Sequence, residues 1–162
     1  MCAMNKKLDE LLNKETVRET LLHSVQTLDL KRYDQFIKLF TENGRYILTA
    51  ESTEIQSNMT WLDLSKSELA ELLEESPKHV HDIAERIHIL SIDEVNFDES
   101  GTSALVNSTF SVFRTERDGG TQVYAVGYYN DDLLLLNGEW KINQRHVKVQ
   151  TRLFKTPTPI PL

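Results

Sequence analysis

The sequence predicts an α+β fold in which helices from the first half of the chain cover one face of a curved antiparallel sheet. Two observations support this prediction. The second half holds four long strand-like runs, at residues 87–97, 103–115, 122–136 and 139–154, separated by short turn sequences. Such short breaks leave no room for the crossovers that parallel strands need. The first half instead carries apolar residues at helical spacing, so helices and strands are segregated along the chain.

The breaks between the strand-like runs are hairpin signals. Asn137-Gly138 lies between apolar residues and is the strongest of them, because both residues tolerate the positive φ of a type I′ turn. Asp118-Gly119-Gly120 and the stretch 98–101 are the other two. Runs of this length twist strongly, so the sheet should curl and need a cover on its concave face.

The first half predicts two helices and a short strand. Thr16 and Glu19 form a capping box, which predicts a helix beginning at Thr16. A second short helix should begin near Tyr33 and end at the stretch 42–44, before a strand at 45–49. The periodic apolar residues that should face the core are Val17, Leu21, Leu22, Val25 and Leu28, then Tyr33, Phe36, Ile37 and Phe40.

Residues 50–64 are interpreted as a loop, and a third helix follows it. Ser65 and Glu68 form a second capping box, and Pro77 should close the helix that they open. In the last strand the apolar positions change parity, so a bulge between Asn143 and His146 is predicted to restore one buried face. The expected organisation is an arm at 1–15, a single α+β domain at 16–155 and a proline-containing tail at 156–162.

Composition excludes several classes of function. The net charge of −7 argues against nucleic acid as a partner, and no run is apolar and long enough to span a membrane. A single cysteine, Cys2, rules out an internal disulfide framework and suits a reducing cytoplasm. A Rieske cluster needs two Cys and two His, so this chain cannot hold one.

Six segments carry a family pattern, and in chain order they read Val17-x-x-x-Leu21-Leu22-x-x-Val25-x-x-Leu28-Asp29, Tyr33-Asp34, Leu39-Phe40-Thr41-Glu42, Ser108-x-Phe110-x-Val112-Phe113-Arg114, Val126-Gly127-Tyr128-Tyr129-x-Asp131-Asp132-Leu133 and Gly138-Glu139-Trp140-Lys141-Ile142-x-x-Arg145-x-Val147. Their order and spacing resemble the β subunits of aromatic-ring-hydroxylating dioxygenases. The resemblance runs from about Val17 to about Leu153.

This resemblance implies a cone-shaped domain of the nuclear-transport-factor-2-like (cystatin-like) kind. It also implies an α3β3 hexamer, in which the partner α subunit holds a Rieske iron–sulfur cluster and a mononuclear iron. A ferredoxin and a reductase would supply electrons indirectly. The β subunit would be structural and would carry no catalytic residue, cofactor or metal of its own.

The sequence departs from the family pattern in two places. The family's Arg-Thr-Arg-His segment is replaced by residues 84–88, and the tail 156–162 replaces a more apolar ending. The stretch 61–65, followed by 88–90, is similar to β subunits whose partners act on aromatic acids such as terephthalate or salicylate. We expect the subunit contacts at the exposed sheet face, the loop 50–64 and the tail.

Two alternatives to a structural subunit involve chemistry. His79, His81 and Asp82, with His88 nearby, could form a two-His-one-carboxylate iron site, or simply a polar turn. His23 and His146 show no partner in the sequence. The cone could also enclose a pocket in which general acid–base catalysis drives an isomerase or dehydratase reaction. Its candidate groups are Tyr33, Asp34, Tyr46, Trp61 and His88, with the structural alternative that both tyrosines are core residues and Asp34 lies on a helix surface.

A third alternative is a homodimer formed through the sheet. Tyr124, Val126 and Tyr128 alternate along one predicted strand, so they should share a face. An apolar strand face that the core does not use is an interface candidate. The sequence leaves open whether this face points outward or packs on the helices.

Overall fold

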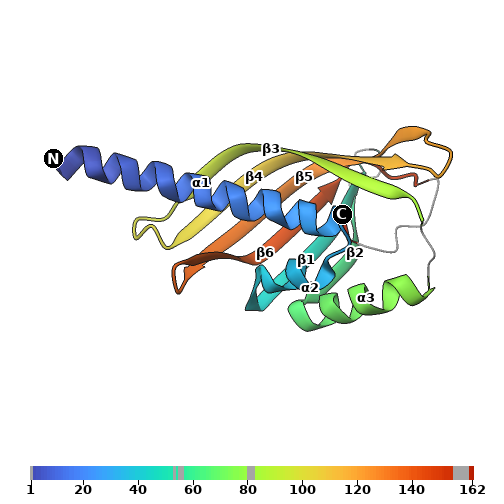
Figure 1. The fold of residues 1–162 in the computed structure, drawn as a ribbon, viewed down its shortest axis with the longest axis horizontal. Coiled ribbons are helices and arrows are strands. Elements are labelled where there is room, and N and C mark those ends of the chain that lie inside the picture. Colours follow the sequence, from blue (N-terminus) through green and yellow to red (C-terminus); the bar gives the residue numbers. More distant parts are fainter. Residues whose placement is uncertain (1, 53, 55–56, 80–82, 155–160) are drawn as a thin grey trace.

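The computed structural model describes residues 2–52, 54, 57–79, 83–154 and 161–162. Figure 1 shows its elements in order. The helices are α1 (Cys2–Asp29), α2 (Tyr33–Lys38) and α3 (Lys66–His79), and the strands are β1 (Phe40–Ser52), β2 (Ser57–Ser65), β3 (Glu85–Phe97), β4 (Ser103–Thr115), β5 (Thr121–Leu136) and β6 (Glu139–Val149). No helix in the described ranges is long and apolar enough to cross a membrane.

The strands form one six-stranded sheet in the order β2-β1-β6-β5-β4-β3. β1 and β6 run parallel, and all the other neighbours are antiparallel. The last four strands therefore form the predicted meander. The one parallel contact is possible because β2, α3 and three further strands separate β1 from β6 along the chain.

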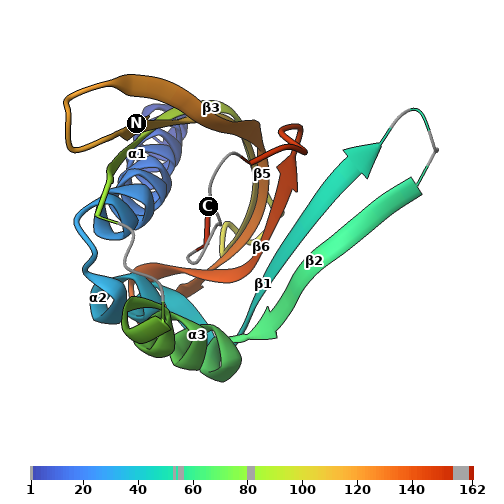
Figure 2. The same ribbon diagram turned by 90° about the vertical axis from the view of Figure 1, so that its right-hand side faces the viewer.

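The sheet curls, and the helices lie on its concave side (Figure 2). Leu21 of α1, Phe36 of α2, Leu69 of α3 and Phe110 of β4 all lie in one buried core between the layers. The predicted α+β cone, with N-terminal helices over the concave face, is confirmed. The ends of β1 and β2 extend beyond the body of the molecule in Figure 2, and the two strands together are called the β1–β2 hairpin below.

The predicted hairpin turn and bulge are both present. Asn137 and Gly138 have φ of 53° and 84°, as a type I′ turn requires. In β6 the register shifts so that Leu133 pairs with Ile142 and Asp132 with Gln144, which leaves Asn143 as the extra residue. This bulge restores one buried face, which is formed by Trp140, Ile142, Arg145, Val147 and Val149.

The first helix begins earlier than the capping box predicts. α1 runs without interruption from Cys2, and the Thr16 hydroxyl donates back to the carbonyl oxygens of Leu12 and Asn13 at 3.2 and 3.0 Å. Inside a helix, a Thr hydroxyl can donate a hydrogen bond to a carbonyl oxygen of the preceding turn, so a capping motif alone does not fix where a helix starts. The first half of α1 extends past the edge of the sheet in Figure 1.

The end of α1 is fixed by a left-handed residue. Lys31 has φ of 56°, and the main-chain N–H groups of Lys31 and Arg32 donate to Leu28 and Thr27. This arrangement is the Schellman closure of a helix. It leaves Asp29, the last helical residue, facing β3, where it takes part in the site described below.

The segment 50–64 was wrongly predicted to be a loop. β2 occupies Ser57–Ser65 and pairs along β1, which itself begins at Phe40 and not at residue 45. β2 is an edge strand with only weak alternation of burial, so its period-2 signal is poor. The capping box that follows is confirmed, because the Ser65 hydroxyl and main-chain N–H lie 2.7 and 2.8 Å from a Glu68 carboxylate oxygen. α3 continues two residues past Pro77.

Candidate functional site

An apolar patch lies on the convex face of the sheet. Ile87, Phe113 and Val123 are direct cross-strand neighbours on β3, β4 and β5, and Ile89 and Val126 flank Ser111 in the next row. Ile87, Ile89 and Val123 are 58–59% exposed. We call Ile87, Ile89, Phe113, Val123 and Val126 the outer-face patch. Its aliphatic side chains face away from the core, so packing within the chain does not account for them.

A bulge in β5 changes which residues belong to this patch. Val112 pairs with Ala125 but Phe113 pairs with Val123, so Tyr124 is the extra residue. Tyr124 is 6% exposed and lies in the core, where the Arg86 guanidinium is 4.5 Å from the centre of its ring. The prediction that Tyr124 shares a face with Val126 and Tyr128 is therefore wrong, and Val123 takes its place on the outside.

Two further regions expose apolar side chains. Leu8, Leu11 and Leu12 on the projecting half of α1 are 55–56% exposed, and Met59 on β2 is 45% exposed. Ion pairs brace the β1–β2 hairpin. Arg45 makes a bidentate pair with Asp63 at 2.7 and 2.6 Å, and the Arg152 guanidinium binds the Glu54 carboxylate.

The inner face of the sheet holds a fully buried ion pair. Arg145 Nε and Nη2 donate to the two Asp131 carboxylate oxygens at 2.8 and 3.0 Å, and Nη1 donates to Ser24 Oγ on α1 at 3.0 Å. Both charged side chains are 0% exposed. The Arg145 guanidinium also lies 4.6 Å from the centre of the Tyr129 ring. Burial alone would lower the pKa of Arg145, but the facing Asp131 carboxylate outweighs it and holds this pKa above its ordinary value.

A second, partly buried polar pair joins α1 to β3. The Asp29 carboxylate accepts from the His88 main-chain N–H at 2.8 Å, and its other oxygen lies 2.6 Å from His88 Nδ1. Because a carboxylate only accepts, Nδ1 carries the proton of this hydrogen bond. The His88 side chain is 2% exposed. β3 is an edge strand, so the same carboxylate also covers one of its otherwise open N–H groups.

The predicted pocket residues are only partly brought together. Tyr46 and His88 lie inside, but Asp34 lies on the surface of α2, 74% exposed, with its carboxylate 3.8 Å from Lys38 Nζ. Tyr33 and Trp61 are half-buried at the margin of the core. The carboxylates inside the cone are Asp29 and Asp131, which the sequence reasoning missed. Asp29 follows Val25 by four residues on the buried stripe of α1, and that spacing was the available signal.

Tyr46 holds the last described segment inside the core. Its Oη donates to the Leu162 carbonyl oxygen at 2.7 Å and accepts from the Leu162 main-chain N–H at 3.1 Å. Leu162 is 0% exposed and belongs to the central apolar cluster. Burial raises the pKa of the Tyr46 phenol above its ordinary value. Pro161 is buried as well, so this end of the predicted contact tail lies in the core. Residues 155–160 lie outside the described ranges.

Within the described residues, no group of three His, Cys, Asp or Glu side chains converges as metal ligands would. His81, Asp82 and the His79 side chain of the hypothetical iron site lie outside what the structure describes. The His88 ring is committed to Asp29. His23 is exposed on α1. His146, expected to lack a partner, lies 2.9 Å from Thr49 Oγ1, and burial followed by the nearby Lys148 charge lowers its pKa.

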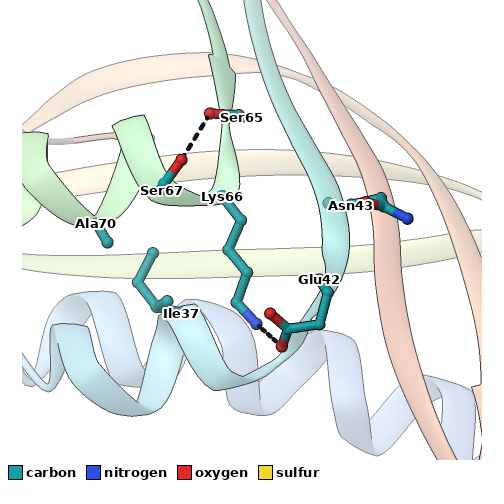
Figure 3. A pocket seen from close by; sticks show the side chains of 8 residues that line it. Ile37, Glu42, Asn43, Ser65, Lys66, Ser67 and Ala70 are labelled. Carbon is teal, nitrogen blue, oxygen red and sulfur yellow. Dashed lines mark hydrogen bonds and ion pairs between the residues drawn. The ribbon is translucent and has the colours of Figure 1, made fainter.

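A surface pocket of about 500 Å³ lies between β1 and the start of α3. Figure 3 shows Lys66 reaching toward Glu42, with Nζ and Oε1 2.8 Å apart, and Ser67 facing Ser65. The hydrogen bond and the charge of Lys66 lower the pKa of Glu42. The polar groups that line the pocket form an ion pair and a helix cap. They therefore have a structural role, and no group of reactive side chains converges in the pocket.

The comparisons with known proteins agree with the α+β fold described above. The SnoaL-like domain matches residues 9–146. The chain is 27% identical over 146 residues to the methanesulfonate monooxygenase hydroxylase β subunit of Methylosulfonomonas methylovora, covering 85% of this chain and 81% of that protein. It is 22% identical over 147 residues to the 2-aminobenzenesulfonate 2,3-dioxygenase β subunit of an Alcaligenes species, covering 91% and 97%.

Among solved structures, the β subunit of a candidate aromatic-ring-hydroxylating dioxygenase from Novosphingobium aromaticivorans has the same fold. Its TM-score is 0.78 at 20% identity, covering 89% of this chain and 93% of that one. The resemblance to dioxygenase β subunits seen in the sequence is confirmed by these matches. Because the domain match spans most of its length, the chain belongs to the SnoaL-like domain family.

Proposed function

We propose that this chain is the structural β subunit of a Rieske-type non-haem iron oxygenase that hydroxylates an aromatic compound in the cytoplasm. Its partner α subunit would carry the Rieske cluster and the mononuclear iron in an α3β3 hexamer, supplied with electrons by a ferredoxin and a reductase. Two relatives that it matches over most of their length are β subunits of oxygenases. The names of both relatives specify sulfonates, one aliphatic and one aromatic, which favours an anionic substrate such as an aromatic acid.

The outer-face patch is the observation that carries this proposal. Ile87, Phe113 and Val123 form a continuous row across three strands, with Ile87 and Val123 59% exposed. Contiguous exposed apolar surface is characteristic of protein interfaces. An obligate assembly would bury well over about 1,000 Å² at such a contact. The exposed leucines of α1 and the β1–β2 hairpin supply further contact surface.

The arrangement of charge inside the cone supports a role without catalysis. Asp131 is bound to Arg145, and Asp29 is bound to His88. The carboxylate proposed as a catalytic base, Asp34, is exposed and far from a closed apolar environment. One cysteine in the whole chain cannot supply the two that a Rieske centre requires. The electron-transfer chemistry therefore belongs to a companion protein.

Co-expression with a neighbouring Rieske-type α subunit tests the proposal. We expect the two proteins to co-purify as a hexamer, measured by light scattering after size-exclusion chromatography. Ile87→Asp and Val123→Asp should release the α subunit or break the hexamer, because each buries a charge in the contact. Asn96→Asp is the matched control, since Asn96 is exposed on β3 away from the patch.

Three results would contradict the proposal. The first is a wild-type chain that never co-purifies with the α subunit, and the second is patch variants that assemble as well as Asn96→Asp. The third is turnover of a small molecule by the purified chain without a companion, which would favour the isomerase or dehydratase alternative. Circular dichroism of each variant separates a lost contact from a lost fold.

A further inference from the structure

Two asparagines of this chain are followed directly by glycine, in the pairs Asn43-Gly44 and Asn137-Gly138. Asparagine is among the thermolabile residues of proteins. In such a pair the main-chain nitrogen of glycine can attack the side-chain carbonyl carbon of asparagine, because glycine has no β-carbon to hinder the approach. The attack requires the main chain to leave its folded conformation locally, so the surroundings of each pair determine which of them reacts.

Asn137 lies at the tip of the hairpin that β5 and β6 form (Figure 1). Asn137 and Gly138 are both exposed, with φ of 53° and 84°. Apart from its neighbours in the chain, no atom of the described residues lies within 4 Å of the position that a β-carbon of Gly138 would take. An exposed turn opens locally at little cost in free energy. The Gly138 nitrogen therefore has room to reach the Asn137 side chain.

Asn43 lies in β1, where the main chain is held by close packing. Gly44 is buried, and a β-carbon on it would lie 2.9 Å from both the Phe40 β-carbon and the Thr41 carbonyl oxygen. The Asn43 side chain is itself exposed, so access to water does not distinguish it from Asn137. The difference between the two pairs is the freedom of the glycine main chain to move.

Side-chain hydrogen bonds restrain three other asparagines of the sheet. Asn130 Nδ2 donates to Asn107 Oδ1 at 2.6 Å, and Asn143 Nδ2 donates to an Asp132 carboxylate oxygen at 3.0 Å. None of the three precedes a glycine, so a β-carbon on the following residue hinders attack in each case. Asn137 is thus the asparagine that combines the reactive sequence with a main chain free to open.

We propose that Asn137 is a site of spontaneous deamidation. The Gly138 nitrogen forms a bond to the Asn137 side-chain carbonyl carbon, the bond from that carbon to the side-chain nitrogen breaks, and ammonia leaves with the Gly138 amide proton. Water then opens the resulting cyclic succinimide at either carbonyl group, which yields aspartate or isoaspartate. Water is the only co-reactant, and the inference is independent of the proposed function because it needs no other protein.

The two products affect the hairpin differently. Asp-Gly suits a type I′ turn as Asn-Gly does, so aspartate preserves the loop and adds a negative charge beside Glu139. Isoaspartate inserts an extra carbon atom into the main chain, which no longer fits the loop that fixes the register of the strands. The pairing of Leu135 with Trp140 lies next to this turn. Isoaspartate should therefore loosen this end of the hairpin.

Peptide mapping by mass spectrometry tests the site after incubation of the purified full chain in mildly alkaline buffer. We expect Asn137 to convert about tenfold faster than Asn43, or more, because the strand opens less often than the turn. The same chain unfolded in urea is the matched control, and there the two pairs should convert at similar rates. The proposal is overturned if Asn43 converts as fast as Asn137 in the folded chain, or if unfolding leaves the ratio of the two rates unchanged.

Asn137→Gly provides an independent arm. It removes the reacting side chain and keeps a Gly-Gly pair that also suits a type I′ turn. Acidic forms separated by ion exchange should then accumulate much more slowly than in the unchanged chain, and equal accumulation in both would overturn the proposal. The separated isoaspartate form should melt at a lower temperature than Asn137→Asp, which carries the same charge without the longer main chain. Equal melting temperatures would contradict the predicted effect on the hairpin.

Discussion

Breaking the buried Arg145–Asp131 pair from one side should strongly destabilise the fold, and Arg145→Leu tests this. The substitution removes two hydrogen bonds to a carboxylate that is 0% exposed, together with the bond to Ser24. It also leaves Asp131 without its counter-charge in the core. Breaking a buried pair from one side costs about 3–5 kcal/mol.

The assay is urea unfolding followed by circular dichroism. With an m value of about 2 kcal/mol/M, a loss of about 4 kcal/mol lowers the midpoint by about 2 M. The double variant Arg145→Leu/Asp131→Leu should recover much of this loss, because no uncompensated charge then remains in the core. A double-mutant cycle therefore measures the coupling directly.

Arg45→Leu is the internal control. Arg45 and Asp63 have the same bidentate geometry, at 2.7 and 2.6 Å, but their side chains are 54% and 41% exposed. Solvent screens that pair, so its loss should shift the midpoint far less. The reasoning is refuted if Arg45→Leu and Arg145→Leu cost the same, or if the double variant is no more stable than Arg145→Leu.

Three further outcomes follow from the structure. Gly127→Ala should destabilise the folded protein by about 1–3 kcal/mol or more, since a β-carbon there would overlap the carbonyl oxygen of Lys148 on the neighbouring strand. Thermal unfolding measures this loss, and an unchanged melting temperature would contradict the packing. The hydrogen bonds from Arg152 lower the pKa of Glu54 to about 2. This ion pair should therefore stabilise the fold above pH 4.5, and its contribution should be lost as the pH falls through about 2. The prediction is refuted if Arg152→Ala leaves the Glu54 pKa unchanged in a carboxyl NMR titration. Ser65→Ala removes the cap of α3 and should cost about 1 kcal/mol, measured as a lower urea midpoint, and an unaffected midpoint would show that the cap is dispensable.

Local sequence determined the parts of this fold whose causes lie within a few residues. Asn137-Gly138 defines a tight turn because both residues accept positive φ. Ser65 and Glu68 begin α3 because their side chains satisfy each other and the first turn. The parity change in β6 predicted its bulge, because one buried face must be continuous.

Only the tertiary structure decided the interior of the cone. Asp29 and His88 are 59 residues apart, and Tyr46 and Leu162 are 116 apart. Such pairs form only when segments far apart in the chain pack together in the folded protein, so the local sequence pattern cannot predict them. The bulge at Tyr124 likewise exchanged it with Val123 on the outer face. Side-chain direction alternates with every strand residue, so one inserted residue reverses which side chains face the core, and only the completed pairing shows where the insertion lies.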